Sequence, residues 1–146
     1  MKYEKSCGCI VIDEGKVLLV HHNCGHWGFP KGHVEGNETE FETAIREVKE
    51  ETNIDVEITS DNRYTIVYNP EEEIEKEVVY FIASKKSDDL KNQESEVQEV
   101  EWVKLEDAVD RITYDNSKDI MRKVIDDIKK DWKIFNLFLF GEILNI

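Results

Sequence analysis

Apolar and polar residues alternate in the first part of the chain with the two-residue period that is typical of β-strands. Residues 6–12 and 17–22 form two such stretches, and a polar turn at residues 13–16 lies between them. A short turn that joins two alternating stretches is the usual signal of an antiparallel hairpin. The sequence therefore predicts that two neighbouring strands open the fold.

Further strand-like stretches follow in the middle of the chain. Residues 54–59 and 63–69 alternate, and a proline with three glutamates at residues 70–73 separates them from residues 77–83. The run at 77–83, EVVYFIA, is the most strand-like because β-branched and aromatic residues dominate it. Residues 97–103 predict one more strand.

Between the early and the later strands, the pattern changes to that of an amphipathic helix. The segment that begins at Thr39 contains neither glycine nor proline, and its apolar residues Phe41, Ala44, Ile45 and Val48 recur at three- and four-residue intervals. This spacing predicts one helix with a single apolar face.

Two more helices are predicted near the end of the chain. Residues 105–111 have a short helical pattern, and Asp115 or Ser117 could cap a second helix. The apolar residues of that second helix are Ile120, Met121, Val124, Ile125 and Ile128. Strands, one helix, more strands and then helices predict an α/β fold with a mixed sheet flanked by helices.

The chain ends in an apolar stretch at residues 132–146, after a single domain at residues 1–131. A membrane span needs about 20 apolar residues, so this stretch, which contains Gly141 and Glu142, is too short and interrupted. The sequence leaves open whether the extension packs on its own core or forms a homodimer contact.

Composition and charge limit the classes of partner. A length of 146 residues fits one domain, and 19 Lys and Arg against 33 Asp and Glu give a formal net charge of −14. Such a charge argues against nucleic-acid and anionic-membrane partners. A polyphosphate substrate would need a divalent cation to offset the like charges.

Three cysteines, Cys7, Cys9 and Cys24, are present, and the first residues do not resemble a secretory signal. A reducing, cytoplasmic setting is the simpler interpretation. Cys7 and Cys9 alternate on a predicted strand, so both side chains should face the same side as small buried apolar groups.

Histidines and a cysteine cluster at residues 21–26, which read HHNCGH. Imidazole and thiolate are preferred zinc ligands. Structural zinc sites, however, usually combine two separated pairs of ligands, so a polar loop beside an active site is the favoured alternative.

Three glutamates on the predicted helix suggest a cation site. Glu47, Glu50 and Glu51 lie on the arc next to the apolar face, at spacings where like charges repel. They could simply face solvent, as runs of charge usually do. Alternatively, a hard cation such as Mg²⁺ or Mn²⁺ could bind them, since it prefers oxygen ligands.

The spacing around these glutamates favours the cation. It resembles the Nudix hydrolase signature G-x5-E-x7-R-E-U-x-E-E-x-G-U, in which U is a bulky aliphatic residue. The matching residues are Gly32, Glu38, Arg46, Glu47, Val48, Glu50, Glu51 and Ile54, whereas Asn53 replaces the last glycine. Asn tolerates the left-handed conformation best after glycine. The resemblance covers roughly residues 6–130 and implies an α/β/α sandwich that hydrolyses a pyrophosphate bond with metal ions at Glu47, Glu50 and Glu51.

A second stretch narrows the resemblance to one branch of this family. Residues 27–35 match the pattern W-x-x-P-K-G-H-x-E, which is similar to the asymmetric diadenosine tetraphosphate hydrolases. The resemblance implies a phosphate contact from Lys31, either a phosphate contact or a structural loop role for His33, and a pocket wall or core role for Trp27. It also implies a further acidic metal ligand, Glu96, with Glu94 and Glu99 close enough to compete for that role. For the adenine ring it implies an aromatic side chain, with Tyr80 as the candidate and burial of Tyr80 in the core as the alternative.

The implied chemistry is attack of water on phosphorus, with Arg46 orienting Glu47 or pairing with Glu38. Either Glu47 or Glu96 could be the general base. The expected substrate is a dinucleoside polyphosphate, split into a nucleoside monophosphate and triphosphate. Two alternatives remain: an RNA 5′ pyrophosphohydrolase, and a nucleotide-sensing module without turnover.

Overall fold

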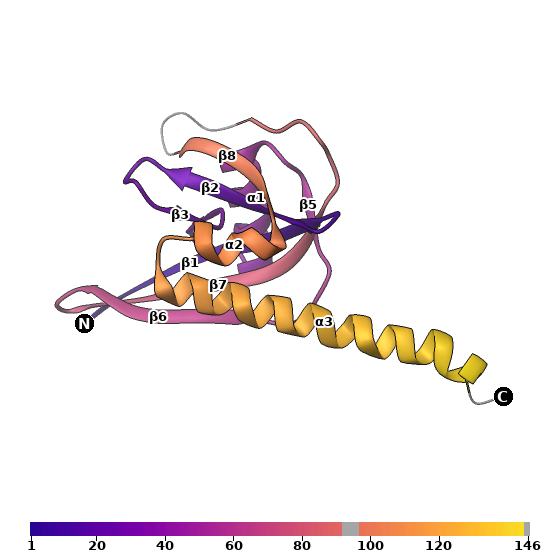
Figure 1. Cartoon of the computed structure of the whole chain (residues 1–146). Helices are drawn as coiled ribbons and strands as arrows, with labels where there is room; N and C mark the ends of the chain where they lie inside the picture. Colours follow the sequence, from indigo (N-terminus) through magenta and orange to yellow (C-terminus); the bar gives the residue numbers. More distant parts are fainter. Residues whose placement is uncertain (92–96, 145–146) are drawn as a thin grey trace.

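The computed structural model describes the backbone of residues 1–91 and 97–144, and the side chains of residues 1–91 and 97–131. Within them lie eight strands and three helices (Figure 1). Their bounds are β1 (Lys2–Asp13), β2 (Lys16–His22), β3 (Trp27–Gly28), β4 (Lys31–His33), α1 (Glu40–Thr52), β5 (Val56–Ile58), β6 (Tyr64–Glu71), β7 (Ile74–Lys85), β8 (Val97–Lys104), α2 (Leu105–Arg111) and α3 (Asp115–Leu144).

The strands form a mixed sheet, as predicted. Its main order is β3-β2-β1-β7-β5, while β4 pairs with β1, β6 with β7 and β8 with β2. The long strands β1 and β7 run parallel, whereas β2 and β8 are antiparallel to each other. The parallel central pair explains the continuous apolar runs in both strands.

Helices cover both faces of the sheet, so the predicted α/β/α sandwich is confirmed. On one face, a core that includes Cys7, Cys9 and Leu18 packs against α1. On the other, a core that includes Ile10 and Leu19 packs against α2 and α3 (Figure 1). The alternation of side chains along β1 and β2 supplies both cores, and it buries Cys7 and Cys9 on the same side as predicted.

The predicted first hairpin is present as β1 and β2. Asp13 pairs with Lys16, and the two residues between them, Glu14 and Gly15, have φ angles of 47° and 77°. Two positive φ angles are the signature of the tight turn whose twist suits paired strands.

The predicted interruption between strands at residues 70–73 is shorter than expected. Strand β6 includes Pro70 and Glu71, and β7 begins at Ile74 rather than at residue 77. Among the described residues β6 pairs only with β7, so it is an edge strand. Proline is tolerated on an edge because its missing N–H removes no hydrogen bond between strands.

Helix α1 begins and ends with clear capping interactions. Thr39 and Glu42 form a capping box, in which the Thr39 hydroxyl accepts from the Glu42 N–H at 3.1 Å. Asn53 ends the helix with φ 64°, which confirms the left-handed conformation expected there. The predicted apolar face is partly wrong, because Phe41 is 43% and Ile45 37% exposed.

Replacing Asn53 by alanine is expected to lower the free energy of unfolding by about 1–2 kcal/mol, because alanine disfavours the left-handed conformation. The substitution also removes a 2.8 Å hydrogen bond from Asn53 Nδ2 to the Asp89 carbonyl. Glycine at position 53 should cost less, since only the side-chain hydrogen bonds to Asp89 are lost. Urea denaturation of both variants checks this, and equal losses would contradict the conformational explanation.

The last helix continues beyond the rest of the fold. Helix α3 runs without interruption through the predicted domain boundary at residue 131, and its second half projects away from the sheet (Figure 1). None of the described helices is both long and apolar enough to cross a membrane. The side chains of residues 132–146 lie outside the description, so the packing and homodimer alternatives stay predictions.

Candidate active site

Strand β4 and helix α1 approach each other closely at Gly32 and Glu47. A Cβ atom added at Gly32 would lie only 2.1–2.3 Å from the carboxyl atoms of Glu47. The position therefore needs glycine for space, not for an unusual φ angle. The missing side chain leaves space for the carboxylate of Glu47, a residue that is only 6% exposed.

Arg46 holds this cluster together through its guanidinium group. Its Nε donates to Glu38 at 2.7 Å, and one terminal nitrogen donates to Glu47 at 2.9 Å and to Glu50 at 3.1 Å. The other terminal nitrogen donates to Glu38 at 2.9 Å and to the His33 carbonyl at 3.0 Å. Arg46 thus makes both of its expected contacts, the pairing with Glu38 and the orientation of Glu47.

Several hydrogen bonds hold the Glu38 carboxylate in place within this network. Besides Arg46, its carboxylate accepts from the Glu35 N–H at 2.9 Å and from the Thr43 hydroxyl at 3.1 Å. The hydrogen bonds from Arg46, with those from Glu35 and Thr43, lower the pKa of Glu38 to about 2. Glu38 therefore stays charged and anchors Arg46 near neutral pH.

Glu51 lies deeper than the other two helix glutamates, at 2% exposure. Its Oε1 accepts from the Lys31 N–H at 2.8 Å, and its Oε2 is 3.7 Å from His22 Nδ1. Glu50, by contrast, is exposed. The alternative that the helix glutamates simply face solvent is therefore wrong for Glu47 and Glu51.

The donor set fits a hard divalent cation. Glu47, Glu50 and Glu51 offer carboxylate oxygens from one helix surface, and Gly32 leaves room for the first of them. Within the described part of the chain, no three such donors converge on one point. Arg46 donates to both Glu47 and Glu50, so a cation there would have to compete with its guanidinium group.

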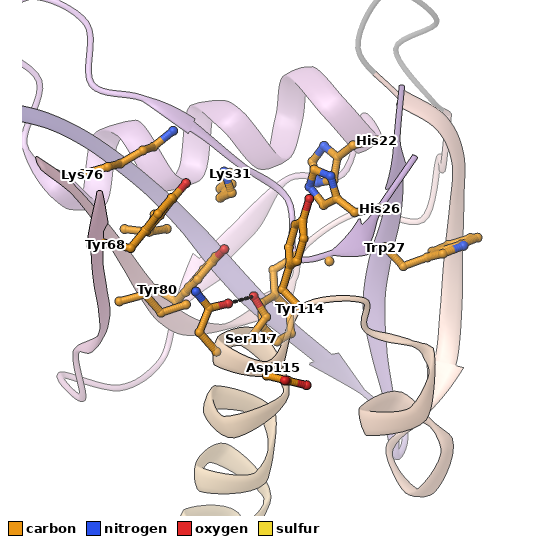
Figure 2. Close-up of a pocket in the computed structure, with 15 residues that line it drawn as sticks. His22, His26, Trp27, Lys31, Tyr68, Lys76, Tyr80, Tyr114, Asp115 and Ser117 are labelled. Atoms are coloured by element: carbon orange, nitrogen blue, oxygen red, sulfur yellow. Dashed lines mark hydrogen bonds between the residues drawn. The ribbon is translucent and has the colours of Figure 1, made fainter. Parts of the chain in front are cut away.

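A cavity of about 680 Å³ borders this cluster. Residues of strands β2, β3, β4, β6 and β7 and of the start of α3 line it (Figure 2). Lys31 and His22 line the cavity and also lie next to Glu51, so the cavity meets the carboxylates there. The other polar and aromatic side chains on which the argument rests are His26, Tyr68, Lys76 and Tyr114.

Tyr80 lines the cavity, but its ring has no face available to a ligand. It is 2% exposed and packs edge-on against Phe29, with 5.1 Å between ring centres. The structure therefore favours core packing for Tyr80. Tyr68 and Tyr114 line the same cavity at 38% and 54% exposure, so they present aromatic surface to it instead (Figure 2).

Trp27 and His33 do not present their rings to the cavity. The Trp27 ring stacks on His21 at 4.8 Å, with the Arg111 guanidinium 4.5 Å from its centre, and it points away from the cavity (Figure 2). His33 is exposed, lies 3.9 Å from Glu4, and is absent from the cavity lining. This placement favours packing for Trp27 and leaves the phosphate role of His33 a prediction.

Lys31 and Lys76 bring two positive charges to the lining of the cavity. Burial and the nearby charge of Lys76 lower the pKa of Lys31, while Glu51 opposes that shift. A lysine held in this way gains from an additional anion, and a phosphate group would supply one. The predicted contact of Lys31 with phosphate is consistent with this position.

The remaining predicted ligand, Glu96, lies outside the described residues, so its role stays a prediction. The zinc alternative at residues 21–26 gains no support in the described part of the chain. Cys24 Sγ lies 3.1 Å from His26 Nδ1, but His22 and His26 stack face to face with ring centres 4.4 Å apart. No set of three donors forms among the described residues there.

Sequence reasoning missed Tyr68, Lys76 and Tyr114 as cavity residues. Tyr68 and Lys76 are cross-strand partners on β6 and β7, and the turn between those strands could have indicated their pairing. Tyr114 directly precedes α3, and no local pattern distinguishes it from an ordinary loop residue.

Comparison with known proteins agrees with this geometry. The NUDIX domain family model matches residues 2–127. An asymmetrical bis(5′-nucleosyl)-tetraphosphatase of Caenorhabditis elegans is 38% identical over 124 residues, which cover 83% of this chain and 87% of the relative. The protein of the same name from Sus scrofa is 31% identical over 139 residues, covering 82% of this chain and 91% of the relative.

Solved structures show the same fold. An Ap4A hydrolase from C. elegans, solved as a binary complex, superimposes with a TM-score of 0.76 at 31% identity, covering 87% of this chain and 98% of its own. A NUDIX hydrolase from Nitrosomonas europaea gives a TM-score of 0.68 at 30% identity, covering 82% of this chain and 68% of its own.

Proposed function

Because the chain belongs to the Nudix hydrolase family and is therefore a pyrophosphohydrolase of nucleoside polyphosphates, we propose that its substrate is a dinucleoside polyphosphate and its cofactor Mg²⁺ or Mn²⁺. Cleavage would give a nucleoside monophosphate and a nucleoside triphosphate from a tetraphosphate. The observation that carries the proposal is the cavity, which joins exposed tyrosines and lysines to the α1 carboxylates.

The lining of the cavity suits both a base and a phosphate chain. Tyr68 and Tyr114 offer aromatic surface on which a base can stack. Lys31 and Lys76 offer positive charge for the phosphate chain, and Lys31 lies beside Glu51. A base held by the tyrosines would leave its phosphates directed toward helix α1.

The residues of this chain would prepare the phosphates for attack by water. The bound cation would neutralise charge on the phosphate oxygens and make a water molecule more acidic. Arg46 orients Glu47 and Glu50, and the Lys31 N–H fixes Glu51. Glu47 remains a candidate for the general base, with Glu96 as the alternative.

A panel of substrates tests the proposal. Diadenosine tetraphosphate, a nucleoside triphosphate and a 5′-triphosphorylated RNA are each incubated with the protein and Mg²⁺ or Mn²⁺, and products are separated by chromatography. We expect AMP and ATP from the first substrate at the highest kcat/KM. Faster release of pyrophosphate from the RNA would favour the RNA alternative, and binding without turnover would favour the sensor.

Replacing Tyr68 or Tyr114 by alanine is expected to raise KM about 10-fold, because stacking on an aromatic side chain contributes about 1–3 kcal/mol per base. The value of kcat should change less than threefold, since neither ring lies among the carboxylates. Steady-state kinetics with diadenosine tetraphosphate measures both. Tyr3→Ala is the control, because Tyr3 is 73% exposed and outside the cavity; equal effects in all three variants would exclude a stacking role.

A further inference from the structure

The connection between α2 and α3 is bonded to strand β3 through Thr113. The Thr113 hydroxyl accepts from the Trp27 N–H at 2.8 Å, and the Thr113 N–H donates to the Trp27 carbonyl at 3.1 Å. The residue before Trp27, His26, accepts from the His22 N–H of β2 at 2.8 Å. Successive residues of an extended chain direct their backbone groups to opposite sides, so Thr113 lies on the edge of β3 that faces away from β2.

Side chains also hold this connection, on both faces of β3. On the outer face, the Arg111 guanidinium lies 4.5 Å from the centre of the Trp27 ring and donates to Glu101 at 2.6 Å. On the cavity face, the Tyr114 ring contacts the His26 ring, with 4.9 Å between ring centres and 40° between the ring planes. In Figure 2, Tyr114 points toward His26 while Trp27 points away from the cavity. The connection therefore contacts the start of β3 through both its backbone and its side chains.

Tyr114 depends on this attachment more than a buried side chain would. It is 54% exposed and lines the cavity, so packing alone restrains its ring weakly. On its C-terminal side, the Tyr114 carbonyl accepts from the Lys118 N–H at 2.9 Å, in the first turn of α3. On its N-terminal side, the adjacent Thr113 makes the two hydrogen bonds to β3. The backbone of Tyr114 is therefore held between α3 and β3.

We propose that Thr113 is a positioning residue for substrate binding, because it fixes Tyr114, and with it the aromatic surface of the cavity, relative to β3. The proposal rests on the proposed function in taking Tyr114 as a surface on which a base stacks. A ring that is already held in place loses less conformational freedom when the base binds, and binding is tighter for that reason. Thr113 is absent from the described residues that line the cavity, so it acts on the substrate through Tyr114.

Replacing Thr113 by valine tests the role of the hydroxyl group, because valine has a similar shape but cannot accept from the Trp27 N–H. We expect Thr113→Val to raise KM for the best substrate of the panel about three- to tenfold, with the loss of stacking on Tyr114 as the upper limit. The value of kcat should stay within about twofold, since the carboxylate cluster is unchanged.

Two further variants serve as controls. Thr113→Ser keeps the acceptor oxygen and should return KM to within about twofold of the wild type. Thr59→Val should leave KM and kcat unchanged. It also removes the hydroxyl of an exposed threonine, one that donates to the Ile82 carbonyl at 3.5 Å, but Thr59 lies outside the cavity lining.

A second substitution separates the positioning of Tyr114 from a general effect on the fold. In the Tyr114→Ala background, Thr113→Val should change KM by less than about twofold, because the ring that Thr113 positions is gone. An equal rise in KM in both backgrounds would overturn the proposal, as would a wild-type KM in Thr113→Val or a failure of Thr113→Ser to restore it. If Thr113→Val does not fold, as judged by circular dichroism, Thr113→Ala takes its place in the same comparison.

The wild type shows which of the two proposals has failed. If it hydrolyses a substrate of the panel and Thr113→Val has the same KM, only the role of Thr113 is refuted. If the wild type hydrolyses none of the substrates, the proposed function is refuted, and the role of Thr113 in substrate binding with it.

Discussion

Replacing Glu50 by glutamine is expected to lower kcat about 100-fold or more while the protein remains folded. The amide has the same shape as the carboxylate, but it lacks the negative charge that a hard cation requires. Loss of a metal ligand removes several kcal/mol of charge stabilisation in the transition state, and each 1.4 kcal/mol is about tenfold in rate. Steady-state kinetics at saturating Mg²⁺ measures the effect.

The stability of Glu50→Gln shows whether a loss of activity comes from a lost metal ligand or from a disturbed fold. The Glu50 side chain is 44% exposed and accepts from Arg46 at 3.1 Å, so its loss removes one weak ion pair and one repelling charge. These effects oppose each other, and the free energy of unfolding should change by less than about 0.5 kcal/mol in metal-free buffer. Glu57→Gln, an exposed charge change on β5, should leave both kcat and stability unchanged. Near-wild-type kcat in Glu50→Gln would refute its role as a ligand.

Local patterns were enough to predict most of the elements. The hairpin at residues 13–16 depends on its own turn residues, and α1 depends on Thr39, Asn53 and the apolar spacing between them. These interactions are short in sequence, so they can be deduced from neighbouring residues. The α/β/α sandwich was predicted from the family resemblance, because no single hydrophobic period specifies how helices and strands are layered.

The short strands could not be predicted in this way. Strands β3 and β4 contain only two and three residues, and they are strands because they pair with β2 and β1. The burial of Glu47 and Glu51 is another tertiary effect. The two carboxylates of α1 can be buried only because each is accommodated by its neighbours. Gly32 leaves space for Glu47, Arg46 donates to Glu47, and the Lys31 N–H donates to Glu51.

The cavity shows a similar limit for function. The resemblance made Tyr80 the candidate for the adenine ring, but the strand around Tyr80 is buried and so is its side chain. Tyr68 and Tyr114 come from β6 and from the residue before α3, and only the folded chain brings them to one cavity. Motif spacing thus identified the charged cluster, whereas the aromatic surface depended on the tertiary arrangement.

Replacing Gly32 by alanine is expected to lower kcat/KM more than 100-fold and the free energy of unfolding by about 1–3 kcal/mol, as for overpacked cores. The added methyl group would occupy the position of the Glu47 carboxyl group. Glu47 would have to move away from Arg46, and the cation site would lose one oriented ligand. Urea denaturation and steady-state kinetics measure the two losses.

A double substitution shows whether the effect passes through Glu47. In Gly32→Ala with Glu47→Ala, the clash is absent, so the stability loss should be at least about 1 kcal/mol smaller than the sum of the single losses. Activity should not return, because the ligand is still missing. Gly28→Ala is the stability control, since its nearest atom, on His26, is 3.9 Å away and no unfolding effect is expected. Additive stability losses would mean that Gly32 acts on β4 itself, and restored activity would mean that Glu47 is dispensable. If the stability losses are non-additive and activity stays lost, Gly32 acts by positioning Glu47 in the cation site.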